Sequence, residues 1–508
     1  MGNLWLIGMM GSGKSTAGRR VAESSDRPFL DVDHLVEGRA GKSVTEIFRQ
    51  DGEHAFRRLE SAEIRRLAAE TAGYGEGTVI STGGGAVLDR DSVVAMRHTG
   101  VVLWLDAPAS SLAVRVGQER PLLAGLETSA SRLAETLDRR RLLYEQAAHY
   151  RIDADRPARA VVLDAARYAR VPVGGSSEVL IGPGLPARLL PLSEHREKAV
   201  VVAQPGAMPV AGEVVDRLRS ETEATLVEVP DREEAKTLET LGVLYARLAD
   251  LNLGRHDTIV GVGGGATTDV AGFAAATWLR GIESVLVPTT LLGAVDASIG
   301  GKTGINVLGK NLVGAFWHPS RVVVGTDALA ALPEELLREG SAEAVKAGFI
   351  ADPRLVEIFL EHGLSFPPAE MLTRAVAVKA AVVSGDFRET GNRAILNFGH
   401  TIGHAVEVVC GLPHGYAVSV GMVAAAAISA DRYGFDRSVV LDALQRLGLP
   451  TRVGGADRDS VLRLVRRDKK RTSAGLRMVL LRRVADPVVE SVDDSALDIG
   501  LNAVGISG

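Results

Sequence analysis

The chain has 508 residues, which is too long for one hydrophobic core and predicts two or three domains. A formal net charge of -5 and a pI near 6.2 argue against a general role on nucleic acids or membrane surfaces. The single cysteine excludes a disulfide framework within one chain, and no apolar run is long enough to predict a transmembrane helix. We therefore expect a cytoplasmic globular protein.

The first predicted elements alternate between strands and helices. The runs LWLIG, TVIST and VVLWL predict parallel strands, and FRRLESAEIRRLAAE predicts a helix. This pattern predicts an α/β domain over residues 1–170, with a parallel sheet flanked by helices. We place a linker at residues 171–179, because VPVGGSSEV contains glycine and serine and lacks helical periodicity.

A phosphate-binding loop is predicted directly after the first strand. Residues 8–15 read GMMGSGKS and fit the pattern G-x-x-x-x-G-K-[ST] between a strand and a helix. Backbone N–H groups of such a loop surround phosphate oxygens, the lysine reaches the β and γ phosphates, and the hydroxyl holds Mg²⁺. The expected ATP-binding residues are Gly11, Ser12, Gly13, Lys14, Ser15 and Thr16, with Ser15 as the Mg²⁺ ligand.

The rest of this domain resembles shikimate kinase through the stretches FLDVDHLVE, HAFRRLE, STGGGAVL, ERPLL and DRRRLLY. The resemblance implies ATP-dependent 3-phosphorylation of shikimate, with Asp33 on the substrate hydroxyls as catalytic base. It implies that Arg57 and Arg140 clamp the carboxylate and that Arg120 closes over ATP. The glycines of the shikimate site would be Gly84 and Gly85. Arg139 and Arg141 remain alternatives to Arg140, because Leu142 stands where the family commonly has proline.

The second half begins with another set of strands and ends in long helices. VLIGPG, KAVVVA, ATLVEV and DTIVGV predict the strands of an α/β subdomain over residues 180–327. GSAEAVKAGFIADPRLVEIFLEHG and VSVGMVAAAAISADRYG predict a helical subdomain over residues 328–508.

Three histidines cluster in LNFGHTIGHAVEVVCGLPHG. His400 and His404 are separated by four positions and share one face if the segment is helical, and His414 follows them. A lone histidine is more often a core residue than a ligand. The spacing alone leaves a metal site and a structural role about equally open.

The second half resembles 3-dehydroquinate synthase from about Leu180 to beyond Leu480. The matching stretches include WLRGIESVLVPTTLLGAVDASIGGKTGINVLGKNLVGAF, GSAEAVKAGFIAD, GNRAILNFGHTIGHAVE and RRDKKRTSAGLRMVLL. The resemblance implies a Zn²⁺ or Co²⁺ ion held by Glu343, His400 and His414, while His404 serves the substrate. Two histidines and one carboxylate leave open coordination positions, as catalytic zinc requires.

The implied reaction converts 3-deoxy-D-arabino-heptulosonate 7-phosphate to 3-dehydroquinate and phosphate, with NAD⁺ oxidising and then re-reducing the substrate. A substrate with a phosphate and a carboxylate needs several cations, and the matching catalytic residues are Arg280, Lys302, Lys346, Lys379, Arg393 and Asn397, with Asn311, Asp296 and Glu389 completing the polar set. The matching NAD-binding residues are Asp231, Glu233, Lys236, Gly264, Gly265, Asp269, Thr289, Thr290, Lys302 and Lys310.

Four details depart from the family pattern or stay open. Tyr416 and Thr268 replace a usual glutamate and glycine, and the loop from Lys302 to Lys310 is one residue shorter than usual. Lys469 and Lys470 are both candidates for a further phosphate contact.

The sequence thus predicts a bifunctional shikimate kinase and 3-dehydroquinate synthase that acts on small molecules, with a homodimer implied by the second resemblance. One alternative joins a P-loop kinase to a metal-dependent polyol dehydrogenase, which would release NADH. Another is a non-catalytic nucleotide-binding regulator. The cluster of candidate cations argues against the dehydrogenase, and the acceptor clamp argues against the regulator.

Overall fold

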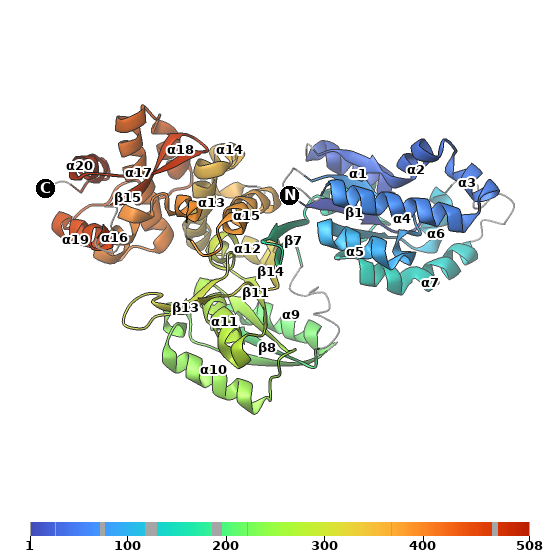
Figure 1. The fold of residues 1–508 in the computed structure, drawn as a ribbon, viewed down its shortest axis with the longest axis horizontal. Coiled ribbons are helices and arrows are strands. Elements are labelled where there is room, and N and C mark those ends of the chain that lie inside the picture. The colour runs from blue at the N-terminus through green and yellow to red at the C-terminus, as the bar shows by residue number, and fades with distance from the viewer. Residues whose placement is uncertain are drawn as a thin grey trace. The chain divides into compact units, whose positions relative to one another are not determined.

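The computed structural model describes residues 2–25, 27–71, 77–116, 130–184, 196–220, 222–366, 368–389, 391–469 and 476–506. The chain divides into two compact units, Met1–Arg170 and Val171–Gly508. Figure 1 shows both units as helices and strands in chain order. None of the described helices is long and apolar enough to cross a lipid bilayer.

The first unit is built on a five-stranded sheet of order β2-β3-β1-β4-β5, in which all paired strands are parallel. Its strands are β1 (Asn3–Ile7), β2 (Phe29–Asp31), β3 (Val79–Ser81), β4 (Gly100–Asp106) and β5 (Tyr150–Asp153). Its helices are α1 (Lys14–Ser24), α2 (Val32–Ala40), α3 (Val44–Gln50), α4 (Glu53–Glu70), η1 (Ala86–Leu88), α5 (Arg90–Thr99), α6 (Ala109–Arg115), α7 (Ala130–Ala147) and α8 (Ala158–Ala165).

The central strands β1 and β4 are buried along their whole length, as expected for a parallel sheet covered on both faces. Because β1, β2 and β3 are parallel, their carboxyl ends meet at one edge. The phosphate-binding loop, Asp33 and the glycines of STGGG follow these three ends, so the topology brings them together.

The second unit contains a seven-stranded sheet of order β6-β7-β14-β11-β10-β8-β9. Its strands are β6 (Ala169–Val173), β7 (Ser177–Gly182), β8 (Lys198–Ala203), β9 (Glu223–Glu228), β10 (Thr258–Gly263), β11 (Glu283–Pro288) and β14 (Arg321–Gly325). The accompanying elements are η3 (Pro205–Ala207), α9 (Met208–Arg219), η4 (Arg232–Ala235), α10 (Leu238–Asp250), α11 (Gly265–Thr277), η5 (Trp278–Arg280), the π-helical turn η6 (Gly293–Ala297), the hairpin β12 (Lys302–Ile305) and β13 (Val313–Phe316), and α12 (Thr326–Ala330).

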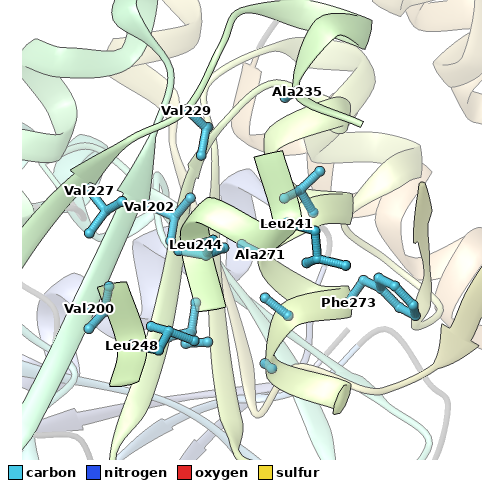
Figure 2. Packing of buried hydrophobic residues seen from close by; sticks show 14 of the residues in the cluster. Val200, Val202, Val227, Val229, Ala235, Leu241, Leu244, Leu248, Ala271 and Phe273 are labelled. Atoms are coloured by element: carbon cyan, nitrogen blue, oxygen red, sulfur yellow. The ribbon is translucent and has the colours of Figure 1, made fainter. Parts of the chain in front are cut away.

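Valine-rich strands and two helices form the core of this α/β part. Val200 and Val202 of β8 pack with Leu244 of α10 and Ala271 of α11, as Figure 2 shows. Helix α11 also approaches the hairpin closely, because a Cβ at Gly272 would lie 2.6 Å from the Thr303 side chain.

The residues that we expected to form a linker, 171–179, do not form a loop. They contain the end of β6 and the start of β7, joined by a tight turn in which Gly174 and Gly175 have φ of 60° and 76°. Val171 and Val173 are buried in alternation with exposed neighbours. The period-two pattern of a short strand therefore outweighs the loop-like composition.

The chain then forms a mostly helical part, drawn in yellow-orange to red in Figure 1. Its elements are α13 (Glu334–Ala351), α14 (Pro353–His362), η7 (Gly363–Ser365), α15 (Pro368–Gly385), η8 (Asn392–Asn397), α16 (His400–Cys410), α17 (His414–Tyr433), α18 (Ser438–Arg446), α19 (Arg458–Lys469), the antiparallel pair β15 (Arg477–Arg483) and β16 (Asp486–Ser491), and α20 (Asp494–Ala503). Helices α16 and α17 pack so closely that a Cβ at Gly421 would lie 1.8 Å from the Gly399 carbonyl oxygen.

Candidate active sites

The predicted phosphate-binding loop connects β1 to α1. Gly11 and Gly13 have φ of 79° and 88°, a region that favours glycine, and Gly13 precedes the first turn of α1. The Lys14 ammonium donates to the carbonyl oxygens of Gly8 at 2.9 Å and Met9 at 3.0 Å. The loop therefore presents a helix N-terminus with a lysine folded over it, an arrangement suited to phosphate.

A carboxylate that our sequence analysis had given no role lies beside the predicted Mg²⁺ ligand. The Ser15 hydroxyl donates to Asp31 Oδ2 at 2.7 Å and lies 3.3 Å from the Ser81 hydroxyl. Ser12 is buried in the same loop, and Thr16 is exposed on α1. Asp31 is the last residue of β2, and the sheet topology places it next to Ser15.

The predicted shikimate residues converge around the glycines after β3. A Cβ at Gly85 would come within 2.2 Å of the Arg57 guanidinium, and a Cβ at Gly83 would lie 2.9 Å from Asp33 Oδ1. The Arg140 guanidinium donates to the Gly84 carbonyl oxygen at 2.9 Å. A side chain at Gly83 or Gly85 would therefore collide with the residues expected to bind the acceptor.

The three consecutive arginines of α7 point to different partners. Arg139 donates to the Glu135 carbonyl oxygen of its own helix, and Arg141 lies 3.8 Å from Asp106. Among the contacts of the described residues, the one between this arginine run and the glycine segment is made by Arg140. Arg120 lies outside the described residues.

Glu60, which sequence reasoning missed, lies at the centre of this group. Its side chain is 2% exposed, and its Oε2 accepts from Arg57 at 2.7 Å. Burial raises the pKa of Glu60 to about 7, against the opposing attraction of Arg57. A cavity of about 140 Å³ lies here, lined by Arg57, Glu60, Ser61, Gly85, Ala86, Leu88, Asp89 and Ser92. A carboxylate three positions after Arg57 was the available signal, but an i,i+3 pair is common on solvated helices.

In the second unit, most of the predicted cofactor residues follow the carboxyl ends of β9, β10 and β11, while Lys302 and Lys310 belong to the β12–β13 hairpin. Gly264 precedes the first turn of α11, and its N–H donates to Gln204 Oε1 at 3.0 Å. Gln204 also accepts from Thr267 at 2.6 Å and donates to Asp231 at 2.6 Å. Gln204 was not among the predicted residues, because a glutamine after a strand carries no sequence signal of this contact.

Two more predicted cofactor residues form a buried ion pair beside this loop. The Lys236 ammonium donates to Asp269 Oδ2 at 2.6 Å and to Asn311 Oδ1 at 2.5 Å. Burial raises the pKa of Asp269 to about 6, although Lys236 opposes the shift. Glu233 accepts from Asn306 at 2.7 Å, which holds η4 against the segment between β12 and β13.

The threonines of this edge make local contacts. The Thr289 N–H donates to the Gly263 carbonyl oxygen at 2.9 Å, and the Thr290 hydroxyl accepts from the Gly293 N–H at 3.1 Å. Thr268, which replaces a usual glycine, is buried and donates from its hydroxyl to the Gly265 carbonyl oxygen at 3.0 Å. The extra side chain is therefore accommodated within α11.

The three predicted metal ligands come together from three helices. Glu343 lies on α13, and His400 and His414 are the first residues of α16 and α17. Glu343 Oε1 lies 3.5 Å from His400 Nε2 and 3.7 Å from His414 Nε2, and these groups can jointly hold a metal ion. The opposite ring nitrogens are occupied, because His400 Nδ1 donates to the Phe398 carbonyl oxygen at 3.2 Å and His414 Nδ1 to Glu407 at 2.9 Å.

The charges of this trio are strongly perturbed. Burial lowers the pKa of His400 to about 3, with Lys346 acting in the same direction. Burial also opposes the charged form of His414, but Glu343 and Glu407 outweigh it and raise its pKa to about 10. Lys346 and the two histidines likewise overcome burial and hold the pKa of Glu343 well below its usual range. Two carboxylates, Glu343 and Glu407, therefore lie on either side of His414. A metal cation bound here would take the place of the His414 proton.

Three of the predicted cations pair with carboxylates, and one of these carboxylates is the predicted ligand Glu343. Lys346 pairs with Glu343, Lys379 with Asp296 and Lys302 with Glu389. Arg393 is 2% exposed and donates to the carbonyl oxygens of Phe387 at 2.7 Å and Gly300 at 3.3 Å.

The other predicted residues of this site differ in how closely they lie to the ligands. The His404 ring lies 5.0 Å from the His400 ring and 5.9 Å from the His414 ring. Asn397 is exposed at the end of η8. Arg280 is exposed in η5 with φ of 69°, and no contact among the described residues joins it to this group. The Lys469 side chain and all of Lys470 lie outside the described residues.

Comparison with known families finds matches in both units. Residues 10–168 match the family model of shikimate kinase. Residues 226–339 match the 3-dehydroquinate synthase N-terminal model, and residues 340–471 match the 3-dehydroquinate synthase C-terminal model. A 3-dehydroquinate synthase of Thermobifida fusca (strain YX) is 46% identical over 345 residues, which cover 65% of this chain and 94% of that protein.

Two solved structures share the fold of the second unit. A 2-deoxy-scyllo-inosose synthase, complexed with carbaglucose-6-phosphate, NAD⁺ and Co²⁺, is 28% identical with a TM-score of 0.60 and covers 66% of this chain and 99% of its own. A 2-epi-5-epi-valiolone synthase from Streptomyces hygroscopicus subsp. jinggangensis 5008, with NAD⁺ and Zn²⁺ bound, is 26% identical with a TM-score of 0.60 and covers 65% and 96%.

Fold, sites and matches together define a P-loop kinase domain followed by an α/β and helical synthase region. The chain belongs to the 3-dehydroquinate synthase family and carries a shikimate kinase domain ahead of the synthase region. It is a bifunctional enzyme with shikimate kinase and 3-dehydroquinate synthase activities of the shikimate pathway. The predicted fold class and pair of activities are confirmed, and the polyol dehydrogenase and regulator alternatives are not supported.

Proposed function

We propose that the synthase reaction, from 3-deoxy-D-arabino-heptulosonate 7-phosphate to 3-dehydroquinate and phosphate, takes place around a Zn²⁺ or Co²⁺ ion held by Glu343, His400 and His414. One observation carries this proposal. Glu343 Oε1 is buried, accepts no hydrogen bond from any described residue, and faces Nε2 of both histidines. A buried carboxylate oxygen without a donor is costly unless a cation binds it. The donor set therefore fits a catalytic metal with open coordination positions.

The surrounding side chains supply binding and proton handling. When bound, the metal supplies Lewis acidity at a substrate hydroxyl, and NAD⁺ supplies a temporary acceptor for a hydride. Cations bind the substrate phosphate and carboxylate, and His404 holds or moves a proton beside the ligands. The cations and polar groups in these roles are Arg280, Lys302, Lys346, Lys379, Arg393, Asn311, Asn397, Asp296 and Glu389.

NAD⁺ binds at the carboxyl edge of the seven-stranded sheet. The N-terminus of α11 offers backbone N–H groups to the pyrophosphate, and Asp231 lies beside it through Gln204. The residues assigned to the cofactor are Asp231, Glu233, Lys236, Gly264, Gly265, Asp269, Thr289, Thr290, Lys302 and Lys310.

The kinase reaction, ATP-dependent 3-phosphorylation of shikimate, uses the groups that converge after β1, β2 and β3. Lys14 moves from the carbonyl oxygens of its own loop to the ATP phosphates, and Ser15 with Asp31 holds Mg²⁺ directly or through water. Asp33 accepts the proton of the reacting hydroxyl, and Arg57 and Arg140 bind the carboxylate against Gly84 and Gly85. The homodimer and the cytoplasmic location remain predictions.

The test measures phosphate release from the heptulosonate phosphate by the full chain with catalytic NAD⁺, before and after chelation. We expect release that requires NAD⁺ and metal, without accumulation of NADH. Glu343→Gln should lose bound metal and phosphate release while the kinase activity of the same chain persists as an internal control. NADH that rises in step with turnover, or unchanged metal content in the variant, would refute the proposed site.

A further inference from the structure

Glu407 holds two groups that the proposed reaction does not connect. It lies on α16, seven positions after His400, and its side chain is 16% exposed. One carboxylate oxygen, Oε2, accepts from His414 Nδ1 at 2.9 Å. The other, Oε1, accepts from the Lys310 ammonium at 2.8 Å. One carboxylate therefore joins a candidate metal ligand to the segment between β12 and β13.

The contact with His414 determines which ring nitrogen is free. With Nδ1–H donating to Glu407, Nε2 faces Glu343 and would be the ligand atom once a metal ion takes the place of its proton. A carboxylate on the far nitrogen makes an imidazole a more basic and better oriented ligand. His400 has only the neutral Phe398 carbonyl oxygen in the same place, at 3.2 Å. The strength of His414 as a ligand therefore depends on how much of the Glu407 charge reaches it.

Lys310 competes for that charge. While its ammonium pairs with Glu407, the carboxylate polarises His414 less. If Lys310 turns to a cofactor phosphate, Glu407 is left to His414 alone. The imidazole then becomes the stronger ligand.

We propose that Glu407 is a positioning residue that couples the metal site to the cofactor site through Lys310. The inference rests on the proposed function, because it takes Glu343, His400 and His414 as metal ligands and Lys310 as a cofactor contact. Bound NAD⁺ tightens metal binding, and bound metal tightens NAD⁺ binding by the same factor, since coupling between two sites is reciprocal. A coupling of about 5-fold or more is the usual size of such effects.

A second geometry is open to the same carboxylate. His404, Glu407 and His414 have ligand atoms within 4.8 Å of one another, so they too form a group that could hold a cation. However, both Glu407 oxygens already have partners at hydrogen-bond distance. The positioning role therefore uses the contacts as they are, whereas a second metal would have to displace them.

The experiment measures Zn²⁺ binding to the metal-stripped full chain by competition with a chromophoric chelator, with and without saturating NAD⁺. We expect one ion per chain and tighter binding with NAD⁺. Glu407→Gln should weaken Zn²⁺ binding about 10–100-fold, the usual effect of losing such a partner, and should abolish the NAD⁺ effect. Lys310→Met should also abolish the NAD⁺ effect but leave Zn²⁺ binding equal or tighter, a divergence that a merely structural role would not produce.

Glu490→Gln is the matched control, because it removes another carboxylate–cation pair of the helical part, the one with Arg432, without touching a histidine or a proposed site residue. It should leave the Zn²⁺ affinity unchanged. Wild-type affinity in Glu407→Gln, or an NAD⁺ effect that survives in either variant, overturns the proposal. Two ions in the wild type and one in Glu407→Gln would make Glu407 a ligand and overturn it as well. Unchanged Zn²⁺ binding in Glu343→Gln would instead refute the proposed metal site, so the two failures are distinguishable.

Discussion

The two units hold their candidate binding cations in different ways. In the kinase unit, Lys14 and Arg140 donate to neutral backbone carbonyl oxygens. In the synthase unit, the five candidate lysines whose side chains are described each pair with a carboxylate, namely Lys236 with Asp269, Lys302 with Glu389, Lys310 with Glu407, Lys346 with Glu343 and Lys379 with Asp296. A phosphate that reaches Lys14 therefore competes with the carbonyl oxygens of Gly8 and Met9 for the ammonium, whereas one that reaches the synthase lysines competes with a carboxylate already in place.

Arg57 is the exception in the kinase unit, since it pairs with both Glu53 and Glu60. The acceptor end of that site thus resembles the synthase site, and the phosphate end does not. Under the proposed roles, carboxylate pairing is found at the acceptor end of the kinase site and at both the substrate and the cofactor lysines of the synthase. The phosphate end of the kinase site differs, because there a helix N-terminus is combined with a lysine that donates to carbonyl oxygens.

The largest expected effect separates the two units. Asp33→Asn should lower the kinase kcat about 10²–10⁴-fold, the usual worth of a general base, with little change in ATP binding. Phosphate release by the synthase should stay at the wild-type rate in the same preparation. Steady-state assays of both reactions measure this. A parallel fall of the two activities would mean that Asp33 supports the whole chain and not the kinase reaction.

The next effect tests the buried carboxylate–lysine pairs. Lys379 is 11% exposed and pairs with Asp296, which joins η6 to α15. Asp296→Asn leaves a buried ammonium without its anion and should destabilise the synthase unit by about 3–5 kcal/mol. The measurement is the shift of the thermal transition assigned to this unit, and the double variant Asp296→Asn/Lys379→Met should recover part of the loss.

The more exposed pair in the same region provides the control. Lys302 and Glu389 are 49% and 34% exposed, so Glu389→Gln should cost no more than about 1 kcal/mol. Equal shifts for Asp296→Asn and Glu389→Gln would show that burial does not decide the strength of these pairs.

The sequence predicted those parts of the sites that lie close together along the chain. The loop from Gly8 to Ser15 and the pair His400 and His404 are short patterns that their own spacing reveals. Strands such as β1 and β10 were also predictable, because continuous apolar runs bounded by glycines are typical of buried parallel strands. Membership in both families followed from such local stretches.

Partners made by tertiary packing were not predictable in this way. Glu60 and Glu407 end the stretches HAFRRLE and GNRAILNFGHTIGHAVE, and Gln204 follows β8, but those stretches do not reveal the contacts that these side chains make with groups on other elements. The linker prediction failed for a related reason. β7 is held by its parallel partner β14, more than a hundred residues further on, and local composition carries no record of that pairing.

The kinase unit should lose stability as pH rises, because its acceptor site buries the carboxyl group of Glu60. The pKa of Glu60 is about 7 in the folded chain, against 4.5 for an unperturbed glutamate. Between these values the unfolded state has released the proton that the folded state keeps, so stability falls as pH rises from about 4.5 to 7. The shift corresponds to at most about 3 kcal/mol, since one pKa unit is worth about 1.4 kcal/mol.

Denaturant unfolding of the wild type and Glu60→Gln at several pH values measures this contribution. The free energy of unfolding of Glu60→Gln should rise relative to that of the wild type as pH rises to 7. A difference that stays constant with pH would show that Glu60 does not hold this proton.

The smallest expected effect concerns how each unit prepares a helix N-terminus for phosphate. The loop before α1 relies on glycine geometry, whereas Gly264 before α11 is held by Gln204, which also reaches Thr267 and Asp231. Gln204→Ala frees these groups to water and should raise the KM for NAD⁺ about 5–10-fold, equivalent to about 1 kcal/mol for a lost hydrogen-bonded group, with kcat unchanged. Gln204→Glu keeps the acceptor for Gly264 but places a second carboxylate against Asp231, so it should raise this KM further. If Gln204→Ala lowered kcat and left the KM for NAD⁺ unchanged, Gln204 would act on the reacting atoms, and the two helix N-termini would differ in chemistry and not only in construction.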